Sequence, residues 1–424
     1  MAVAVLAHPQ ADATTRSARC RFCDATLTTT FVDLGMSPLC QTHIEPQQLN
    51  RMEPFYPLHA WVCDNCFLVQ LEQYVGPAEL FTEYAYFSSY ADSWVEHARR
   101  YAEAMRARFG LGRDSFVIEI ASNDGYLLQH FVAAGVPVLG IEPAANVAMV
   151  AGKRGVRTEI GFHSHEHAGR IVAQYGQADL VLGNNVLAHA PDLNDFVAGL
   201  RQLLKPRGVI TMEFPHLQQL MQQNQFDTIY HEHFSYFSFV TVQRVFAAHG
   251  LRLFDVEELP THGGSLRIYA CHDGNAAQPS QPGVAALAAR ERAAGFERLE
   301  TYRGFADQVK ATKREILACL LGIKREGKRI AGYGAPGKGN TLLNYCGIRT
   351  DFLDFTVDRN PYKQGKYTPG TRIPILDPDQ IRATRPDYIF ILPWNLKDEI
   401  MARLAYARDW GGRFIVPIPR PQVL

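Results

Sequence analysis

The chain has 424 residues and carries 43 Lys and Arg side chains against 43 Asp and Glu side chains, so its formal net charge is zero. Its length predicts two to four domains, each able to bury a core, and the balanced charge without like-charged blocks argues against nucleic acid as a partner. Because no run approaches about 18 apolar residues and the first residues lack a basic signal start, we expect a cytoplasmic protein with small-molecule chemistry and no membrane partner.

The first predicted element is a zinc-binding domain over residues 15–72, after a tail at residues 1–14 that we expect to be disordered. Two Cys-x-x-Cys pairs occur in this domain, and residues 67–71 have the pattern of a strand. Two such pairs can present four thiolates to one tetrahedral Zn²⁺ ion, which leaves no open position for catalysis. Cys40 and His43 lie between the pairs and are alternative ligands, although two complete pairs already supply four. We therefore predict a structural zinc site made by Cys20, Cys23, Cys63 and Cys66.

Residues 73–275 are predicted to form a larger α/β domain. An aromatic segment at residues 84–90 precedes an amphipathic helix at residues 94–109. Short apolar runs then alternate with helical segments, which predicts a doubly wound, Rossmann-like parallel sheet. The expected strands are residues 116–120, 138–141, 180–182 and 208–214, followed by a closing pair at residues 251–257 and 265–271.

Residues 276–424 are predicted to form a second, smaller Rossmann-like α/β domain with a helical linker. A segment rich in Pro and Gln leads into long helical sequence at residues 284–327. Strand-like runs separated by glycine-rich or helical segments then indicate another α/β unit. These runs are residues 329–333, 352–357 and 388–392.

A glycine-rich turn at residues 331–340 follows the first strand of this smaller domain and precedes a helix. Its backbone N–H groups, with Lys338 beside them, suit a diphosphate, although close packing of strand against helix explains the glycines nearly as well. Asp358 ends the next strand, so NAD remains an alternative ligand for this turn.

The first strand of the larger domain ends in a polar turn that is typical of a cofactor site. Glu142 ends the second strand about 20 residues later, where an acid suits the hydroxyls of a ribose. The turn resembles the Glu/Asp-x-Gly-x-Gly loop of S-adenosylmethionine methyltransferases, with Ala121 and Asn123 in the usual glycine positions. Residues 180–189 and 204–213 match the fourth and fifth strands of that class. The predicted cofactor residues are Glu119, Ala121, Asn123, Gly125, Glu142, Pro143, Asn184, Asn185, Tyr84 and Ser88.

Five proton-handling side chains crowd into seven positions: Tyr230, His231, Glu232, His233 and Tyr236. Proton transfer is one interpretation, and a half-buried strand or ordered loop with hydrogen-bonded polar tips is the other. A metal site on the two histidines is a third, but the helical His-Glu-x-x-His spacing is absent. Among the remaining histidines, we expect solvated surface positions for His163, His165 and His167.

Over nearly its full length, the chain resembles the three-part sugar C-methyltransferases that act on nucleotide-linked 4-keto deoxysugars. The resemblance rests on the paired cysteine knuckle and on residues 86–90, 119–125, 184–189, 230–234, 262–267 and 339–346. It implies methyl transfer from S-adenosylmethionine to C3 of the sugar in deoxysugar biosynthesis, with thymidine diphosphate (dTDP) as the expected nucleotide. Removal of the C3 proton beside a ketone gives an enolate, which needs a base and donors for the oxyanion but no metal.

The resemblance also implies roles for individual residues. His233 matches the base, Tyr230 and Glu232 position the sugar or the histidine tautomer, and His189 bonds the keto oxygen. Methylation of a sugar hydroxyl or amine and a non-catalytic scaffold that binds nucleotide sugars are the alternatives, and the oligomeric state is left open. The expected substrate-binding residues are Tyr86, His262, Gly263, Arg267, Gly337, Lys338, Asn340, Lys363, Tyr367 and Trp394.

Overall fold

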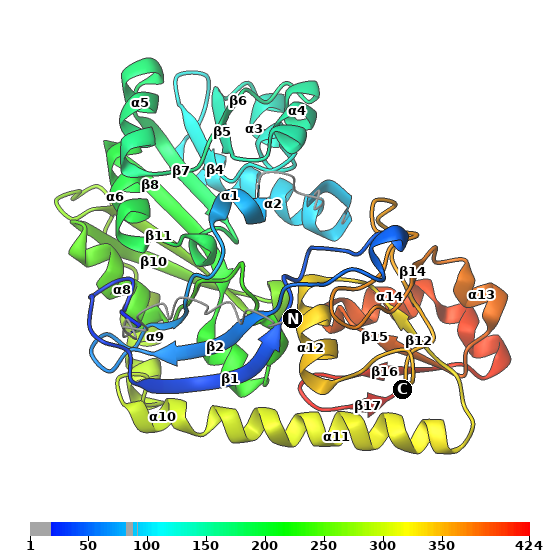
Figure 1. The fold of residues 1–424 in the computed structure, drawn as a ribbon. Helices are drawn as coiled ribbons and strands as arrows, with labels where there is room; N and C mark the ends of the chain where they lie inside the picture. The colour runs from blue at the N-terminus through cyan, green and yellow to red at the C-terminus, as the bar shows by residue number, and fades with distance from the viewer. Residues whose placement is uncertain (1–17, 82–87, 91) are drawn as a thin grey trace, which may run out of the picture.

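The computed structural model describes residues 18–81, 88–90 and 92–424, and its strands form three sheets (Figure 1). The sheets have four, seven and six strands, in that order along the chain. The predicted fold class, a doubly wound domain between a small N-terminal unit and a smaller α/β unit, is confirmed. The predicted tail and the proposed ligand contacts Tyr84 and Tyr86 lie outside the described residues.

The N-terminal sheet is antiparallel and includes a strand from the middle of the chain. Its strands are β1 (Thr29–Ser37), β2 (Tyr56–Val62), β3 (Val69–Leu71) and β9 (Ser235–Tyr236). β9 pairs with β3 through Val69 opposite Tyr236 and Gln70 opposite Ser235. The proton-handling segment therefore ends in a strand of the zinc-binding unit.

The seven-stranded sheet has the order β10-β11-β8-β7-β4-β5-β6, with β4 to β8 parallel and β11 antiparallel to both neighbours. Every residue of β4 is buried, as expected for a central parallel strand covered on both faces. The strands are β4 (Val117–Ile120), β5 (Val138–Glu142), β6 (Thr158–Ile160), β7 (Ala178–Asn184), β8 (Leu204–Pro215), β10 (Leu251–Leu259) and β11 (Ser265–His272). The predicted strands are all present, and β6 is an additional one.

Helices precede the strands of this sheet or connect them along the chain. They are α1 (Pro77–Phe81), α2 (Asp92–Phe109), α3 (Leu128–Ala133), α4 (Ala145–Lys153), α5 (His165–Tyr175), α6 (Leu193–Leu203), α7 (Leu217–Gln222) and α8 (Phe239–Ala248). The amphipathic helix predicted at residues 94–109 corresponds to α2.

The long helical sequence folds as three helices, α9 (Pro282–Ala293), α10 (Leu299–Arg303) and α11 (Phe305–Arg325). The chain turns after α9 because Gly295 adopts a φ of 87°, a left-handed conformation that ends the helix. α11 runs beneath both the N-terminal strands and the C-terminal unit in Figure 1, and it packs on β1 and on α12 (Gly337–Cys346).

The C-terminal sheet has the order β14-β13-β12-β15-β16-β17 and is parallel except for β17. Its strands are β12 (Ile330–Tyr333), β13 (Thr356–Val357), β14 (Ile375–Leu376), β15 (Tyr388–Ile391), β16 (Arg413–Val416) and β17 (Gln422–Val423). Its remaining helices are α13 (Gln380–Thr384) and α14 (Lys397–Arg403).

The three units share one continuous hydrophobic core. Phe31 on β1, Met212 on β8 and Ile389 on β15 belong to a single cluster of buried side chains. Phe31 stacks on Phe305 of α11 with ring centroids 4.6 Å apart. The units are therefore packed as one body around any site that lies between them.

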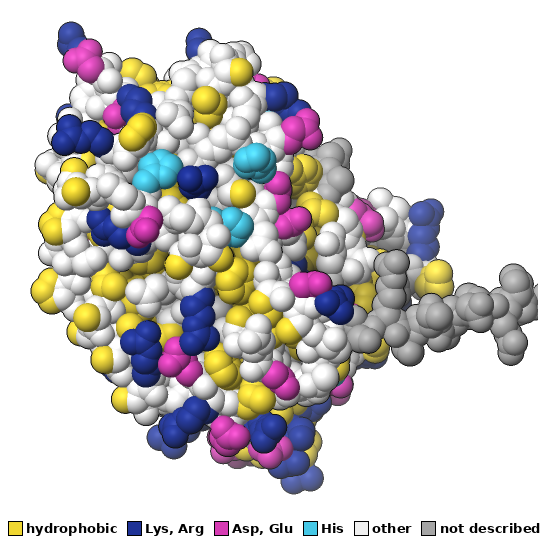
Figure 2. All heavy atoms as spheres, turned by 90° about the vertical axis from the view of Figure 1, so that its left-hand side faces the viewer, with side chains coloured by type: hydrophobic (Ala, Val, Ile, Leu, Met, Phe, Trp, Pro, Cys, Tyr) yellow, Lys and Arg dark blue, Asp and Glu magenta, His cyan; other side chains and the backbone are white. Residues whose placement is uncertain are grey.

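The surface carries both signs of charge. Figure 2 shows Lys and Arg side chains interspersed with Asp and Glu side chains over one face of the molecule, in agreement with the net charge of zero. Within the described ranges, no helix combines the length and apolar character needed to cross a bilayer.

Candidate functional site

A cavity of about 710 Å³ lies where the three units meet. Its walls come from the carboxyl ends of β4, β5 and β7, from the segment before β9, and from the start of α12, with Gln41 of the N-terminal unit at one side. Ligands of doubly wound sheets bind beyond the carboxyl ends of parallel strands, and this volume suits a cofactor with a substrate.

The turn after β4 forms the first wall of the cavity. Ala121 and Asn123 adopt left-handed φ angles of 55° and 49°, so these two positions have the conformation that favours glycine in the related loops. Asn123 also accepts a hydrogen bond from the N–H of Ser88 at 2.9 Å. Gly125 is left-handed as well, and an added Cβ would lie 3.1 Å from Val156, so glycine is required for close packing rather than for ligand contact.

The carboxylate of Glu142 at the end of β5 faces this turn. Its oxygens accept hydrogen bonds from the N–H groups of Asn123 at 3.0 Å and Ala144 at 2.9 Å, which fix the carboxylate at the cavity wall beside Pro143. Burial raises the pKa of Glu142, and these two bonds oppose that shift. Each oxygen keeps capacity for a further donor, as a ribose diol would supply.

Asn184 and Asn185, at the end of β7, give the cavity its amide groups. Asn184 Nδ2 is buried without a hydrogen-bond partner among the described residues, so a donor is available to a bound molecule. Asn185 Nδ2 lies 2.7 Å from Nε2 of His262, across the cavity wall. The turn after β4, the carboxylate at the end of β5 and the amides at the end of β7 therefore offer hydrogen-bonding groups that suit a nucleoside cofactor.

His233 lies in the second half of the cavity and is held as a neutral base. Its Nδ1 is 2.9 Å from the carbonyl oxygen of Thr228, and because a carbonyl only accepts, Nδ1 carries the proton. Nε2 is then the basic nitrogen. Burial first, and then the neighbouring His189, hold the pKa of His233 well below the usual range for histidine.

Three further side chains surround His233. The ring centroid of Tyr230 lies 4.0 Å from that of His233, and the ring centroid of His189 lies 4.7 Å from it. Glu232 also lines the cavity, and Cys40 Sγ donates to its Oε1 at 3.3 Å. The four predicted catalytic residues therefore share one wall, whereas the alternative zinc ligand Cys40 supports Glu232.

His231 points away from the cavity, toward the N-terminal unit. Its Nε2 lies 3.1 Å from the carbonyl oxygen of Pro57, and its ring contacts Tyr56 edge to face at 5.9 Å. The two histidines of this segment thus face different surroundings. Only His233 could meet a ligand in the cavity, and the two do not form a shared metal site.

The C-terminal unit contributes a half-buried cation at the N-terminus of α12. Lys338 Nζ lies 2.9 Å from Asn395 Oδ1 and 4.5 Å from the centroid of the Trp394 ring. Burial lowers the pKa of Lys338, and Asp227 opposes that shift. Lys363 also lines the cavity and donates to the carbonyl of Ala335 at 2.8 Å. An anionic ligand would meet two ammonium groups here.

Asp358 is the acid that left NAD as an alternative ligand of the glycine-rich turn, and both of its carboxylate oxygens accept hydrogen bonds from the protein backbone. Its Oδ2 accepts a hydrogen bond from the N–H of Ala335 at 2.7 Å, and its Oδ1 accepts one from the N–H of Asn360 at 2.8 Å. The carboxylate therefore closes the glycine-rich turn.

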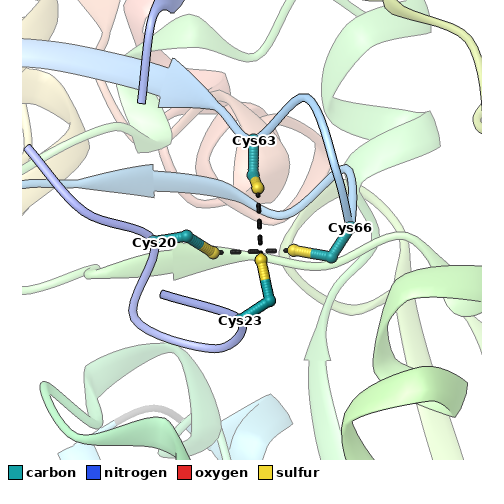
Figure 3. A group of neighbouring side chains, drawn as sticks. All are labelled: Cys20, Cys23, Cys63 and Cys66. Carbon is teal, nitrogen blue, oxygen red and sulfur yellow. Dashed lines mark hydrogen bonds between the residues drawn. The ribbon is translucent and has the colours of Figure 1, made fainter. Parts of the chain in front are cut away.

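The four paired cysteines converge in the N-terminal unit. Figure 3 shows their sulfur atoms pointing toward one another, with Cys20 and Cys66 at 3.5 Å and Cys23 and Cys63 also at 3.5 Å. All four sulfur atoms lie within 4.8 Å of one another. Four thiolates in this arrangement fit a tetrahedral Zn²⁺ ion with a closed coordination shell.

Family models match most of the chain in three consecutive pieces. Residues 20–81 match the "Putative zinc binding domain", residues 94–256 a methyltransferase domain and residues 260–419 the C-methyltransferase C-terminal domain. The C-methyltransferase NovU of Streptomyces niveus is 39% identical over 405 residues, which cover 96% of each protein. The chain belongs to the C-methyltransferase family. The predicted use of S-adenosylmethionine and the predicted zinc-binding domain are thereby confirmed.

Solved methyltransferase structures are more distant from this C-methyltransferase. Magnesium protoporphyrin IX methyltransferase (ChlM) of Synechocystis PCC 6803 with bound SAM is 15% identical, with a TM-score of 0.32, and covers 43% of this chain and 82% of its own. The DhpI–SAH complex is 23% identical, with a TM-score of 0.32, and covers 45% and 89%. The family assignment does not depend on these two structures.

Arg267, predicted to bind substrate, does not reach the cavity of the C-methyltransferase. Its guanidinium is buried and paired with Glu213 at 2.7 Å and Glu257 at 2.9 Å. Glu213 also accepts a hydrogen bond from Thr261 at 2.9 Å, and Thr261 precedes His262. Arg267 therefore neutralises a buried carboxylate beneath the loop that carries His262.

Other predicted residues also lie behind the cavity wall. Trp394 donates its indole N–H to Asp227 at 2.7 Å, and Tyr367 pairs through its backbone with Ile44. Glu119 is fully buried, and burial together with Glu142 raises its pKa well above the usual range. The predicted residues that do not line the cavity are Glu119, Gly125, Gly263, Arg267, Asn340, Tyr367 and Trp394.

Several cavity residues were missed by sequence reasoning, among them Gln41, Trp94, Tyr126 and Asn395. Trp94 contacts the ring of His262 edge to face at 5.1 Å. An aromatic at the start of the predicted helix was the only signal for it. No sequence pattern near Gln41 indicated a role in the cavity. Gln41 belongs to the N-terminal unit, whose recognisable motif is the cysteine cluster at a separate site.

The expectation that three histidines after β6 are solvated was wrong for two of them. His167 is buried, and its Nδ1 lies 2.9 Å from the carbonyl oxygen of Phe162. Burial lowers the pKa of His163 to about 4, and this residue lines the cavity. His163 Nε2 lies 3.1 Å from the carbonyl oxygen of Phe196 on α6, whereas His165 is exposed.

Two half-buried histidines that favour the neutral form predict a loss of stability in acid. Burial lowers the pKa of His189 and of His262 to about 4, below the 6.5 of a free histidine. The unfolded chain therefore binds more protons below pH 6.5, so the contribution is complete above 6.5 and is lost as the pH falls toward 4. We expect the free energy of unfolding to fall between pH 7 and pH 5 by about 2 kcal/mol for each histidine.

Urea unfolding of two variants at both pH values checks this prediction. His262→Asn should make the fall smaller by about 2 kcal/mol, since asparagine tolerates the left-handed φ of 56° at this position. His165 is exposed, so His165→Asn is the control and should leave the fall in the free energy of unfolding between pH 7 and pH 5 unchanged. Equal falls in both variants would contradict the assignment, and acid effects on the cysteine cluster cancel in the comparison.

Proposed function

We propose that this C-methyltransferase transfers the methyl group of S-adenosylmethionine to C3 of a nucleotide-linked 4-keto deoxysugar, with dTDP as the nucleotide, in deoxysugar biosynthesis. One observation carries the proposal. A single cavity brings together the nucleoside-type wall at Glu142, the neutral base His233 and the cationic turn at Lys338. For this reaction the enzyme has to bind three groups at once. They are the methyl donor, the sugar carbon that loses its proton and the diphosphate of the nucleotide.

The proposed reaction begins with His233 Nε2 taking the proton from C3. The electrons of the C3–H bond delocalise into the C4 carbonyl, which becomes an enolate oxygen. S-adenosylmethionine supplies an electrophilic methyl group; C3 bonds to it while the sulfur keeps the electrons of the broken bond. Because the pKa of His233 is low, it is a weak base, and donors to the C4 oxygen have to lower the barrier. The rings of His189 and Tyr230 lie beside that of His233, which supports this role for them.

The nucleotide part of the substrate is assigned to the C-terminal wall. α12 has ten residues and begins at Gly337, so its first N–H groups and the Lys338 ammonium provide positive potential for a diphosphate. An added Cβ on Gly337 would lie 3.0 Å from Cys40 Sγ, which explains glycine at the helix start. Lys363 and His262 complete the proposed substrate contacts in the cavity.

Deuterium exchange at C3 tests the reaction type. A dTDP-linked 4-keto sugar incubated in D₂O with the enzyme and without S-adenosylmethionine should gain one deuterium at C3, and addition of the donor should give a product with a new C–C bond. Mass spectrometry and NMR distinguish the products. Exchange no faster than in buffer, together with a methyl ether or methylamine product, would exclude the enolate route.

The proposed cofactor wall predicts a specific loss of donor affinity. Glu142→Ala should raise the Kd for S-adenosylmethionine by about 10- to 100-fold, because hydrogen bonds to a charged acceptor contribute about 1.5–3 kcal/mol. Glu159→Ala on the neighbouring β6 is the control, since Glu159 bonds Tyr175 outside the cavity. Isothermal titration calorimetry measures both affinities. Similar affinities for the two variants would place the donor elsewhere.

A further inference from the structure

Arg21 stands between two of the paired cysteines, yet its side chain leaves the cysteine cluster. Its Nη1 donates to the carbonyl oxygen of Pro191, and its Nη2 donates to the carbonyl oxygen of Leu71. The guanidinium carbon lies 5.2 Å from the centroid of the Phe234 ring. Arg21 does not line the cavity, so it contacts neither of the two expected ligands.

The groups that Arg21 binds adjoin the two active-site histidines. Pro191 follows His189 by two positions, and Phe234 directly follows His233. Phe234 N–H donates to the carbonyl oxygen of Ala188 at 2.7 Å, so the two segments are also bonded to each other. The Arg21 guanidinium thus contacts both histidine segments. The ring centroids of His189 and His233 in these segments lie 4.7 Å apart.

A backbone path connects the same segments to the cysteine cluster. β3 pairs with β9 immediately after the His233 segment, and Leu71 N–H donates to the carbonyl oxygen of Phe234 at 3.0 Å. Gln70 on β3 accepts a hydrogen bond from the N–H of Arg21 at 2.9 Å, and its Nε2 lies 3.2 Å from Cys20 Sγ. Arg21 therefore sits where the cysteine knuckle, β3 and β9 meet.

We propose that Arg21 is a positioning residue that couples the zinc-binding knuckle to the two histidine segments of the active site. A planar guanidinium is suited to this role because it donates in fixed directions to two carbonyls and stacks on an aromatic ring at the same time. Its role in turnover rests on the proposed function, whereas the mechanical coupling does not. Without the guanidinium, the Pro191 and Leu71 carbonyls lose a shared donor, and the Phe234–Ala188 hydrogen bond has to hold the spacing of the His189 and His233 segments without it.

Arg21→Met tests the coupling, because methionine keeps much of the aliphatic stem and removes the donors. We expect unchanged zinc content, a Kd for S-adenosylmethionine within about twofold of the parent, and a fall in kcat of about 10- to 100-fold. Amide hydrogen exchange over residues 233–236 should become at least about tenfold faster. Arg21→Lys, which keeps the charge and can reach one carbonyl at a time, should recover part of both effects.

Arg19→Met is the matched control on the same knuckle. Arg19 is exposed, and its guanidinium pairs with Asp24 on the knuckle itself, so turnover and exchange should remain as in the parent. Unchanged exchange and kcat in Arg21→Met would overturn the proposal, as would a loss of kcat that accompanies lost zinc or lost donor affinity. If exchange responds as expected while no keto sugar is methylated by the parent enzyme, the coupling stands and the proposed function fails.

Discussion

Replacement of His233 by Asn is expected to abolish nearly all methyl transfer, with kcat lowered by about 10²- to 10⁴-fold. The asparagine amide can still donate to the Thr228 carbonyl, where His233 Nδ1 lies at 2.9 Å, but it offers no basic nitrogen in place of Nε2. Deuterium exchange at C3 should be lost to the same extent, because proton removal precedes methyl transfer in the proposed reaction. The Kd for S-adenosylmethionine should stay close to that of the parent enzyme.

His231→Asn is the matched control, two positions earlier in the same segment. His231 contacts Pro57 and lies outside the cavity, so kcat and exchange should remain within severalfold of the parent. Kinetics of the two variants, measured beside circular dichroism as a check on folding, decide the assignment. If His231→Asn stops exchange while His233→Asn keeps it, the base has been assigned to the wrong residue.

Loss of the cysteine cluster is expected to have the largest effect on stability. Cys63→Ser removes one of four thiolates that lie within 4.8 Å of one another and leaves the others without a closed tetrahedral site. Because metal binding is coupled to folding, we expect the free energy of unfolding to fall by about 3 kcal/mol or more and the unfolding midpoint by about 10 °C. Metal analysis should give about one zinc per parent chain and a strongly reduced amount in the variant.

Cys319→Ser is the control for a cysteine outside the cluster, on α11. It should retain zinc and change the unfolding midpoint only slightly. A chelator should lower the midpoint of the parent and of Cys319→Ser alike, and should change that of Cys63→Ser much less. A Cys63→Ser protein with full zinc content and parental stability would contradict the four-cysteine site.

The parts that the sequence predicted well are those with local signals. The cysteine pairs, the apolar strands at residues 116–120 and 138–141, and the glycine-rich turn at residues 331–340 each depend on short patterns, and the structure has an element at each. The long helical sequence was harder to divide, because a single left-handed glycine after α9 ends one helix within otherwise helical composition.

The site was less predictable wherever residues far apart in the sequence meet in the fold. Arg267 carries a charge near the predicted substrate loop, but its partner Glu213 is 54 positions away and takes that charge. Gln41 reaches the cavity, and Arg21 reaches the histidine segments, only because of how the units pack. Spacing alone also could not separate His231 from His233, since the surroundings that distinguish them come from Pro57 and Thr228.

The pairing of β3 with β9 has a consequence for synthesis of the chain. Tyr236 lies beyond the midpoint of the 424 residues, so the N-terminal sheet stays incomplete on the ribosome until most of the middle unit has emerged. Until then β3 presents an open edge, which nascent chains can pair with wrongly. Binding of the metal by the four paired cysteines during translation would hold β3 in place until β9 has been synthesised. Protein fragments that end before residue 236 should be prone to aggregation.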